Sequence, residues 1–461
     1  MMKLFTIRRL LLFSVVLCTP ALTAAETRPN VLLIMVDDLG YADLSSYGST
    51  DMQTPQLDRL MAEGMRFNEF YTNSCVCSPT RAAFLTGRYP EMVGMPGVTR
   101  LHKRASWGNL TPDSVMLPEL FQAAGYKTTL IGKWHLGIED GDRPNQRGFD
   151  EFQGLLLGMM DDYWEHSRQG FQQMRRNEEK IHPEGHGTDL ITQWSIEAIE
   201  RDVKAGIPFF QFLAYNAPHF PVQPPEEWLE KVQEREPGID PVRAKMVAFV
   251  EHLDDGIGKV LAAVDDLGIR ENTIVYFSSD NGGLVRVGSN NGSLRAGKTD
   301  VYEGGIKSPA VIRWPARIAA EQQTNFRALT MDVIPTIAEV CGISIDHPID
   351  GQSFAELLLT GKQNPFARPE FYMWMQNDRT EKKKENRKDC SKEAVRFGDW
   401  KLVQNAWMPL HNRSEIKYEL FNLAKDPSEE NNVAKKYPEK TKQLTQLLET
   451  HIKKARKVQW K

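Results

Sequence analysis

Short apolar runs without polar alternation recur along the chain, and they predict strands that are buried on both faces. Between them lie segments in which apolar residues return every three or four positions, as on one face of a helix. Strands that alternate with helices favour a parallel sheet that is covered by helices on both faces. The predicted strands are 31–36, 127–132, 208–215 and 273–279, and the predicted helical segments are 54–65, 114–126 and 248–268.

The pattern changes beyond about residue 350, where shorter segments alternate apolar and polar residues. The runs FYMWM, EAVRFGDWKLVQN and IKYELFNL predict strands, and 438–454 predicts one amphipathic helix. The charged run 381–389 is typical of a solvated loop. We therefore expect an α/β catalytic domain over 26–355 and a small C-terminal α+β domain over 356–461, with an antiparallel sheet and a terminal helix.

The first 25 residues have the layout of a secretory signal peptide. Lys3, Arg8 and Arg9 precede a short apolar run, and small residues lead to Ala24 and Ala25, after which cleavage is expected. The alternative is an N-terminal membrane anchor, but the apolar run is shorter than the roughly 20 residues that span a bilayer. These features predict an exported protein that is periplasmic or secreted (lysosomal in a eukaryote), with no membrane association.

Composition excludes some partners. A hydrophobic share of 41% is sufficient for a large core, and a net charge of -4 gives no indication of nucleic-acid binding. After signal removal four cysteines remain, and none of their spacings is typical of a zinc site. One disulfide is possible, but its pairing does not follow from the sequence. The four cysteines are Cys75, Cys77, Cys341 and Cys390.

Polar side chains follow each of the predicted strands at its carboxyl end. Ligands of open α/β sheets bind beyond these ends, so four such endings suggest one site. The residues concerned are Asp37 and Asp38, then Lys133, Trp134 and His135, then Asn216 and His219, and finally Asp280 and Asn281.

The residue types in this set indicate the chemistry. Carboxylate and amide oxygens suit a hard cation such as calcium or magnesium. Taken singly, Asp-Asp could cap a helix, and Asp-Asn-Gly-Gly could form a tight turn. Positive side chains around a metal describe a pocket for a small, highly charged oxyanion ester. The positive candidates are Arg81, Lys133, His135 and Lys298.

A cysteine stands just before the N-terminus of a predicted helix in CSPTRAAFLTGR, which runs over 77–88. Pro79 is favoured in a first helical turn, and helix N-termini favour anions. Cys77 could act there as an activated thiolate. A thiolate that faces an anionic ester beside a hard cation is chemically unattractive, however. The residues alone leave this question open.

The same stretch resembles the signature of the sulfatase family, and GKWHLG over 132–137 resembles the second signature of that family. Both motifs are specific, and their order and spacing match type I sulfatases. The resemblance extends over most of the mature chain and is closer to arylsulfatases and N-acetylgalactosamine-6-sulfatases. It implies the alkaline-phosphatase-like fold, a large mixed, mostly parallel sheet between helices. It also implies hydrolysis of a sulfate ester in a sulfated carbohydrate or an aryl sulfate.

The resemblance also implies roles for individual residues. A maturation enzyme would convert Cys77 to formylglycine, whose hydrate attacks sulfur through one hydroxyl and expels sulfate through the other. Calcium would be bound by residue 77 with Asp37, Asp38, Asp280 and Asn281. The other implied roles are Arg81 orienting the formylglycine, Lys133 and Lys298 on the sulfate oxygens, His135 as the base and His219 beside the leaving oxygen.

Two other functions compete with a sulfatase. A phosphoester or phosphonate hydrolase of the same fold would share the metal carboxylates, although the paired lysines favour sulfate. A catalytically inactive carbohydrate-binding relative would have lost the cysteine or a metal ligand, and none is lost. Residues in loops are further candidates for sugar contacts, and three sequons permit glycosylation. The former are Trp107, Asp162, Trp164, His166, Arg396 and Trp407, and the latter are Asn109, Asn291 and Asn412.

Overall fold

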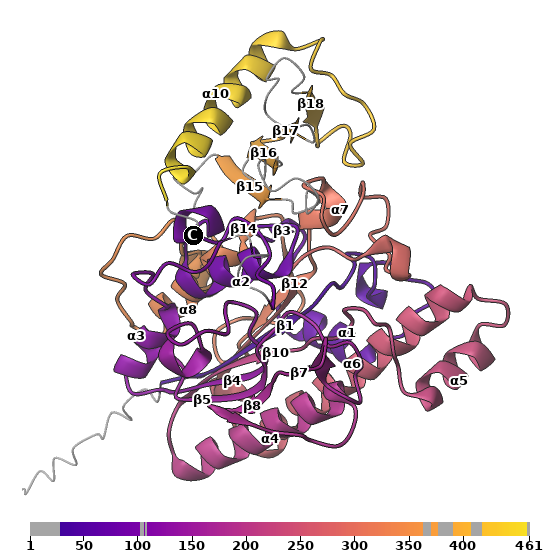
Figure 1. Cartoon of the computed structure of the whole chain (residues 1–461), viewed down its shortest axis with the longest axis vertical. Coiled ribbons are helices and arrows are strands. Elements are labelled where there is room, and N and C mark those ends of the chain that lie inside the picture. The colour runs from indigo at the N-terminus through magenta and orange to yellow at the C-terminus, as the bar shows by residue number, and fades with distance from the viewer. Residues whose placement is uncertain are drawn as a thin grey trace, which may run out of the picture.

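The computed structural model describes residues 28–101, 106, 108–362, 370–376, 391–406 and 417–458. It shows a large α/β body with a smaller sheet and one long helix at its C-terminal end (Figure 1). Several sequence predictions lie outside the described residues. These are the signal peptide, the loop 381–389, Cys390, Asn412 and the sugar-site candidates Trp107 and Trp407.

Within the described residues, ten strands form the main sheet in the order β13-β2-β12-β11-β1-β10-β4-β5-β8-β9. The five strands from β11 to β5 are parallel, whereas β12 and β8 are antiparallel to their neighbours on the inner side. The sheet is therefore mixed and mostly parallel. Its strands are β1 (Asn30–Val36), β2 (Met65–Phe67), β4 (Lys127–Lys133), β5 (Glu151–Leu155), β8 (Met174–Arg176), β9 (Glu179–Lys180), β10 (Phe209–Ala214), β11 (Thr273–Ser279), β12 (Ala310–Arg313) and β13 (Gln322–Thr324).

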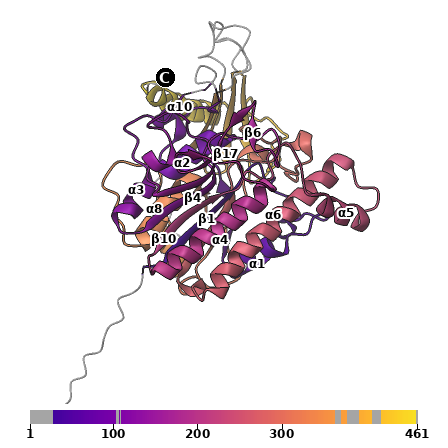
Figure 2. The same ribbon diagram turned by 60° about the horizontal axis from the view of Figure 1, so that its bottom comes forward.

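Helices cover both faces of this sheet because its central strands are apolar on both sides. Alternate residues of β1 enter two separate cores, one through Leu33 and the other through Ile34. The first core includes α2 (Cys77–Thr86), α3 (Leu117–Ala123), α8 (Thr330–Val340) and α9 (Ala355–Thr360). The second includes α1 (Pro55–Glu63), α4 (Gly187–Ala205) and α6 (Pro241–Asp266), which lie in front of the sheet in Figure 2, with α5 (Glu226–Arg235) packed outside α6.

The predicted helix over 248–268 begins earlier in the structure. α6 starts at Pro241, a residue that is favoured at a first helical position. The side chain of Asp240 accepts hydrogen bonds from the backbone N–H groups of Val242 and Arg243, both at 3.0 Å. This N-terminal cap explains the extra turns, which the apolar pattern alone did not reveal.

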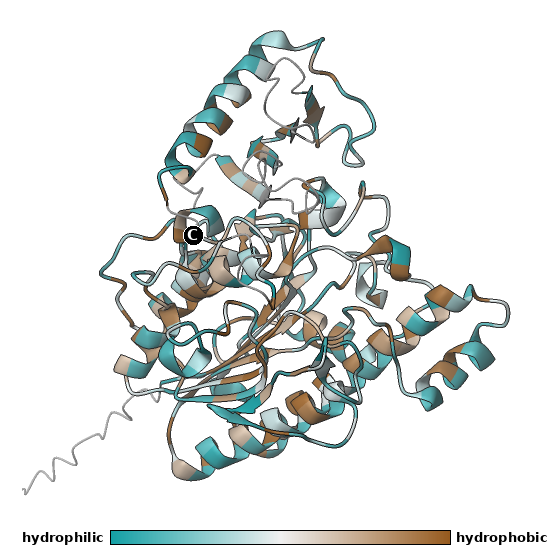
Figure 3. Ribbon diagram, viewed as in Figure 1, coloured by the Kyte–Doolittle hydropathy of each residue, from teal (hydrophilic) through white to brown (hydrophobic). Residues whose placement is uncertain are grey.

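The C-terminal domain is a four-stranded antiparallel sheet, within the described residues, and one helix. Its strands β15 (Glu370–Gln376), β16 (Ser391–Phe397), β17 (Trp400–Ala406) and β18 (Lys417–Asn422) pair in chain order. Helix α10 (Pro438–Ala455) is amphipathic, with hydrophobic residues among mainly hydrophilic ones (Figure 3). It packs Leu444, Leu448 and Ile452 against the sheet. The predicted fold class is therefore confirmed, including its small C-terminal domain.

Further short elements lie outside the main sheet and the C-terminal sheet. Strand β3 pairs with β14, and β6 pairs with β7. Helix α9 starts at the predicted domain boundary and packs Leu357 and Leu358 into the core of the larger body. The exact domain limits stay a prediction. These elements are β3 (Phe70–Tyr71), β6 (Ser167–Arg168), β7 (Phe171–Gln172), α7 (Glu303–Ile306) and β14 (Ala328–Leu329).

Candidate active site

The carboxyl ends of four parallel strands bring the predicted residues together. Strand β1 lies between β10 and β11, so Met35 pairs with both Ala214 and Ser278. The chain then continues from β1 into Asp37, whose N–H donates to the carbonyl of Ala217 at 3.1 Å. Because neighbouring strands end at the same level, side chains that follow them meet above the sheet.

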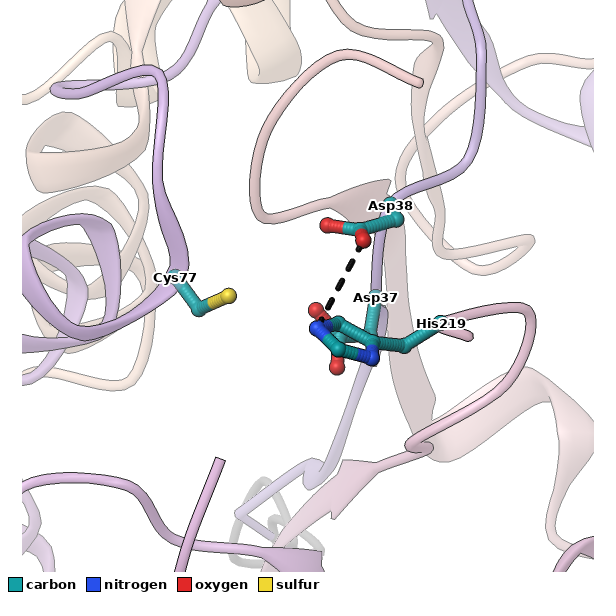
Figure 4. A group of neighbouring side chains, drawn as sticks. All are labelled: Asp37, Asp38, Cys77 and His219. Atoms are coloured by element: carbon teal, nitrogen blue, oxygen red, sulfur yellow. Dashed lines mark ion pairs between the residues drawn. The ribbon is translucent and has the colours of Figure 1, made fainter. Parts of the chain in front are cut away.

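Four of these side chains form a compact group that is drawn in Figure 4. A ligand atom from each of Asp37, Asp38, Cys77 and His219 lies within 4.8 Å of the others. The Cys77 side chain points from α2 toward the two aspartates at the end of β1. His219 Nε2 lies 3.6 Å from Asp38 Oδ2. All four residues are buried, so the group is not a surface cluster.

Two lysines, the buried Lys133 and the partly buried Lys298, neutralise the first two carboxylates. Lys133, at the end of β4, pairs with Asp37. Lys298 Nζ donates to Asp38 at 2.7 Å and lies 3.6 Å from Cys77 Sγ. Burial alone would raise the pKa of Asp38, but the charge of Lys298, followed by that of His219, lowers this pKa to about 2. Asp38 is therefore a carboxylate at neutral pH.

Arg81 and Asp280 form a second buried pair. The guanidinium donates through Nε to Asp280 Oδ2 at 2.9 Å and through Nη1 to the carbonyl of Lys133 at 3.1 Å. Its Nη2 lies 2.9 Å from the same carboxylate oxygen as an ion pair. Burial and the nearby carboxylate of Asp37 raise the pKa of Asp280 to about 6 despite the arginine. Arg81 thus ties α2, which carries Cys77, to the ends of β11 and β4.

Cys77 is the first residue of α2, whereas the sequence prediction placed it just before the helix. Its N-cap, Val76, offers no side-chain hydrogen bond, so the first N–H groups of the helix are not capped by a side chain. Burial, followed by the charge of Asp37, raises the pKa of the Cys77 thiol to about 12. The unmodified side chain is therefore a neutral thiol in this structure.

The two histidines differ in their hydrogen bonds. His135 Nε2 lies 3.0 Å from the carbonyl of Thr99, which places the proton on Nε2 and leaves Nδ1 as an acceptor. Among the described residues, Nδ1 has no partner. Burial and the charge of Lys133 hold the pKa of His135 well below its usual value. His219 instead uses Nδ1, 2.6 Å from the carbonyl of Phe220, and burial, then Lys298, lowers its pKa to about 3.

The oxygen atoms of this group fit a hard cation. Asp37 Oδ1 and Asn281 Oδ1 are buried without a hydrogen-bond partner in the described part of the chain. The Asn281 amide donates through Nδ2 to Asp38 Oδ1 at 2.8 Å, which leaves its oxygen available. Unpaired buried oxygens are costly, and a divalent cation with oxygen ligands would satisfy them.

Tyr163 was missed by the sequence analysis. Its hydroxyl donates toward the carbonyls of Asn216 and His219, at 2.8 and 3.0 Å, and accepts from the Asn216 amide at 2.6 Å. Tyr163 therefore holds the loop that presents His219. In the sequence, only its position between Asp162 and Trp164, two candidates for sugar contacts, could have drawn attention to Tyr163.

The sugar-site candidates within the described residues have different surroundings. Trp164 is 51% exposed and is free to contact a ligand, whereas His166 is buried with Nε2 on the carbonyl of Gly185. Asp162 accepts from Gln223 at 2.6 Å. Arg396 is buried against Tyr71, Glu69 and Glu303 between the two domains. That ion-pair network occupies its guanidinium, so we withdraw Arg396 as a sugar ligand.

The structure also bears on the glycosylation sequons, the cysteines and the question of a membrane-spanning helix. Asn291 is buried, and its side chain bonds to Gly283 and to the carbonyl of Ala296, so this sequon is inaccessible in the folded protein. Cys75, Cys77 and Cys341 are free thiols. None of the described helices combines the length and the apolar character that a membrane crossing requires.

A second group of potential metal ligands consists of His186, Asp189 and His252. His186 Nδ1 accepts the N–H of Thr188 at 3.2 Å, and Nε2 lies 3.0 Å from the carbonyl of Gln223. Both ring nitrogens of His186 are therefore engaged. We assign no metal to this group.

Comparison with known proteins agrees with this geometry. The family model for sulfatases matches residues 29–343, and the model for the C-terminal region of N-sulphoglucosamine sulphohydrolase matches residues 297–458. The chain is 34% identical to N-acetylgalactosamine-6-sulfatase of Mus musculus over 373 residues, which cover 76% of this chain and 69% of the relative. It is 34% identical to human arylsulfatase A over 383 residues, with 76% and 71% covered.

The fold has similar solved structures as well. The crystal structure of Ps i-CgsB in complex with k-i-k-neocarrahexaose matches with a TM-score of 0.80 and 29% identity, and 92% of each chain is covered. The chain therefore belongs to the sulfatase family. It is an enzyme that hydrolyses sulfuric esters.

Proposed function

We propose that this sulfatase releases inorganic sulfate from a sulfated carbohydrate, with a formylglycine derived from Cys77 as the nucleophile. The single observation that supports this most directly is the buried group of Asp37, Asp38, Cys77 and His219 beside two lysines. The similarity to N-acetylgalactosamine-6-sulfatase and to a protein solved with k-i-k-neocarrahexaose supports a sugar substrate. An aryl sulfate would serve as a simpler substrate for the same site.

Maturation would convert the Cys77 thiol to an aldehyde before folding buries it. The hydrated aldehyde would supply two hydroxyls. One would attack sulfur as the sugar oxygen leaves, and deprotonation of the other would expel sulfate and regenerate the aldehyde. Arg81, which pairs with Asp280 next to the start of α2, would hold residue 77 in place. A formylglycine-generating enzyme is thus a transient partner, and we propose export from the cytosol as the setting.

Calcium is the cation that we propose for the oxygen ligands Asp37, Asp38, Asp280 and Asn281, together with residue 77. A hard divalent cation there would polarise the nucleophile and neutralise charge on the sulfate group. Lys133 and Lys298, which pair with Asp37 and Asp38 in this structure, would donate to sulfate oxygens when a substrate binds.

The two histidines would move protons on opposite sides of the reaction. His135 has a free lone pair on Nδ1, so it would accept the proton of the hydroxyl that expels sulfate. The neutral His219 ring keeps its proton on Nδ1, which donates to the carbonyl of Phe220, so Nε2 is free of a proton. To protonate the leaving sugar oxygen it would first take up a proton at Nε2, which the negative charge of a bound sulfate ester would favour. A sugar alkoxide leaves poorly without such a proton.

The test is hydrolysis of nitrophenyl sulfate by protein that was made together with a maturation enzyme. We expect sulfate release that a chelator abolishes and calcium restores. Nitrophenyl phosphate and phenyl phosphonate esters, assayed in parallel, test the alternative hydrolases of the same fold. Faster turnover of either phosphorus ester would contradict the proposed substrate class, and unchanged activity after chelation would contradict the metal.

A further inference from the structure

The backbone on both sides of Lys298 adopts a conformation that few side chains tolerate. Ala296 has a φ of 61° and Thr299 a φ of 77°, both in the left-handed region. For threonine, which is branched at Cβ, a positive φ is a genuine outlier. Such a conformation persists only where the surrounding structure enforces it, and it is concentrated at functional sites.

Contacts from the catalytic domain hold most of this segment. The Ala296 carbonyl accepts from the side chain of Asn291 at 3.0 Å, and the Lys298 N–H donates to the carbonyl of Gly283 at 3.1 Å. The Thr299 N–H donates to the carbonyl of Cys75 at 2.9 Å. The segment is thereby linked to the residues around Cys77 and Asn281.

The remaining support comes from the other domain. Lys392, on strand β16, donates through Nζ to the carbonyl of Thr299 at 3.1 Å and pairs with the Asp300 carboxylate. Lys392 is only 4% exposed. A buried ammonium is costly unless it is paired, so this contact requires the 299–300 backbone to stay where it is.

We infer that Lys392 is a positioning residue for Lys298, through which the C-terminal sheet holds a sulfate-binding group in the catalytic domain. This inference rests on the proposed function of Lys298. Lys298 Nζ must reach Asp38 at 2.7 Å and lie 3.6 Å from the sulfur of residue 77, so a shift of its backbone would misplace it. A misplacement of about 1 Å can cost about 100-fold in rate.

A double-mutant cycle on nitrophenyl sulfate tests this role. Lys392→Met removes the ammonium and keeps most of the side-chain volume. We expect it to lower kcat/KM by about 10- to 100-fold. In a Lys298→Ala background the same change should cost less than about twofold, because the group that Lys392 positions is already absent. An equal loss in both backgrounds would overturn the inference.

Two further variants separate positioning from stability. Lys401→Met is the matched control, since Lys401 is also a buried lysine of the C-terminal sheet and pairs with Glu303 of the catalytic domain at 3.0 Å. It should lower the melting temperature but leave kcat/KM of the folded enzyme within about twofold. Lys392→Arg, which can contact the same carbonyl and carboxylate, should restore much of the activity. Equal losses for Lys392→Met and Lys401→Met at matched folded fractions would contradict the positioning role.

Hydrogen exchange provides a readout that does not depend on turnover. Lys392→Met should accelerate amide exchange in the peptide over 295–300 and leave the peptide over β1 unchanged. Wild-type exchange rates in this peptide would overturn the inference even if activity fell. If the wild-type enzyme released no sulfate, the proposed function would fail, whereas the exchange measurement would still decide whether Lys392 holds the loop.

Discussion

Each of three carboxylates in this site forms an ion pair with one positively charged side chain. The carboxylates of Asp37, Asp38 and Asp280 pair with Lys133, Lys298 and Arg81 respectively. A cation that binds the carboxylates would compete with the lysines, and a sulfate group would give the lysines a new partner. Metal and sulfate should therefore bind better together than separately.

Thermal shift measurements on the purified protein test this coupling. We expect calcium and sulfate together to raise the melting temperature by more than the sum of their separate effects. Chloride at matched ionic strength is the control for salt. Simple additivity of the two shifts would contradict the linkage between the lysines and the metal carboxylates.

His219 can be tested by the dependence of its effect on the leaving group. If it protonates the leaving oxygen, His219→Ala should lower kcat by about 10²–10⁴-fold for a sugar sulfate. The loss should be much smaller for nitrophenyl sulfate, because a nitrophenolate leaves without protonation. Equal losses on both substrates would show that His219 only binds the sulfate group, and we would then withdraw its role as the acid.

The secondary-structure elements show how far the sequence pattern reaches. The strands β1, β4, β10 and β11 were predictable from their short, mainly apolar runs, and polar residues that follow them lie close together in the structure. The start of α6 was not predictable from the sequence pattern. The N-terminal cap at Asp240 determines it, and the spacing of apolar residues does not. The roles of Tyr163 and Lys392 depend on contacts between distant segments, and no local pattern records such contacts.

A buried carboxyl group makes the stability of the C-terminal sheet depend on pH. Glu393 on β16 accepts hydrogen bonds from Ser391 and Gln404, and burial, which outweighs these bonds, raises its pKa to about 7. The unfolded chain loses this proton at a lower pH than the folded chain. The folded state is therefore penalised increasingly as pH rises from the unfolded pKa of about 4.5 to about 7, and fully above that.

The variant Glu393→Gln should remove this penalty. We expect it to be more stable than the wild type at pH 8, by up to about 3 kcal/mol, and equal to it near pH 4. The exposed Glu449→Gln on α10 is the control and should change little at either pH. Denaturant titrations at the two pH values measure the difference. An equal gain in stability at the two pH values would contradict the raised pKa of Glu393.

Across the whole molecule, buried ion pairs connect the two domains. Lys401 on β17 lies 3.0 Å from Glu303 and 2.8 Å from Glu429, and all three are buried. Arg396 adds contacts to Tyr71 and Glu69 at the same interface. Of these contacts between the domains, the one from Lys392 reaches the 299–300 backbone next to Lys298, whereas those of Lys401 and Arg396 lie at Glu303 and Glu69.

Removing one partner of this network should be costly. Lys401→Met leaves two buried carboxylates without their lysine, so we expect a loss of about 3–5 kcal/mol in the free energy of unfolding. We also expect the wild-type domains to unfold in one cooperative transition. Chemical denaturation that is followed by tryptophan fluorescence and circular dichroism measures both. Two separate wild-type transitions would contradict the coupling of the domains.

The central claim is that a formylglycine at residue 77 performs sulfate-ester hydrolysis. The most direct measurement is mass spectrometry of the tryptic peptide over 67–81, made on the same enzyme preparation whose sulfate release is assayed, with Cys77→Ala alongside. The account predicts an aldehyde at residue 77, a thiol at Cys75, and sulfate release in proportion to the aldehyde content, with none from Cys77→Ala. Full turnover by a preparation that carries an unmodified Cys77, or by Cys77→Ala, would contradict it.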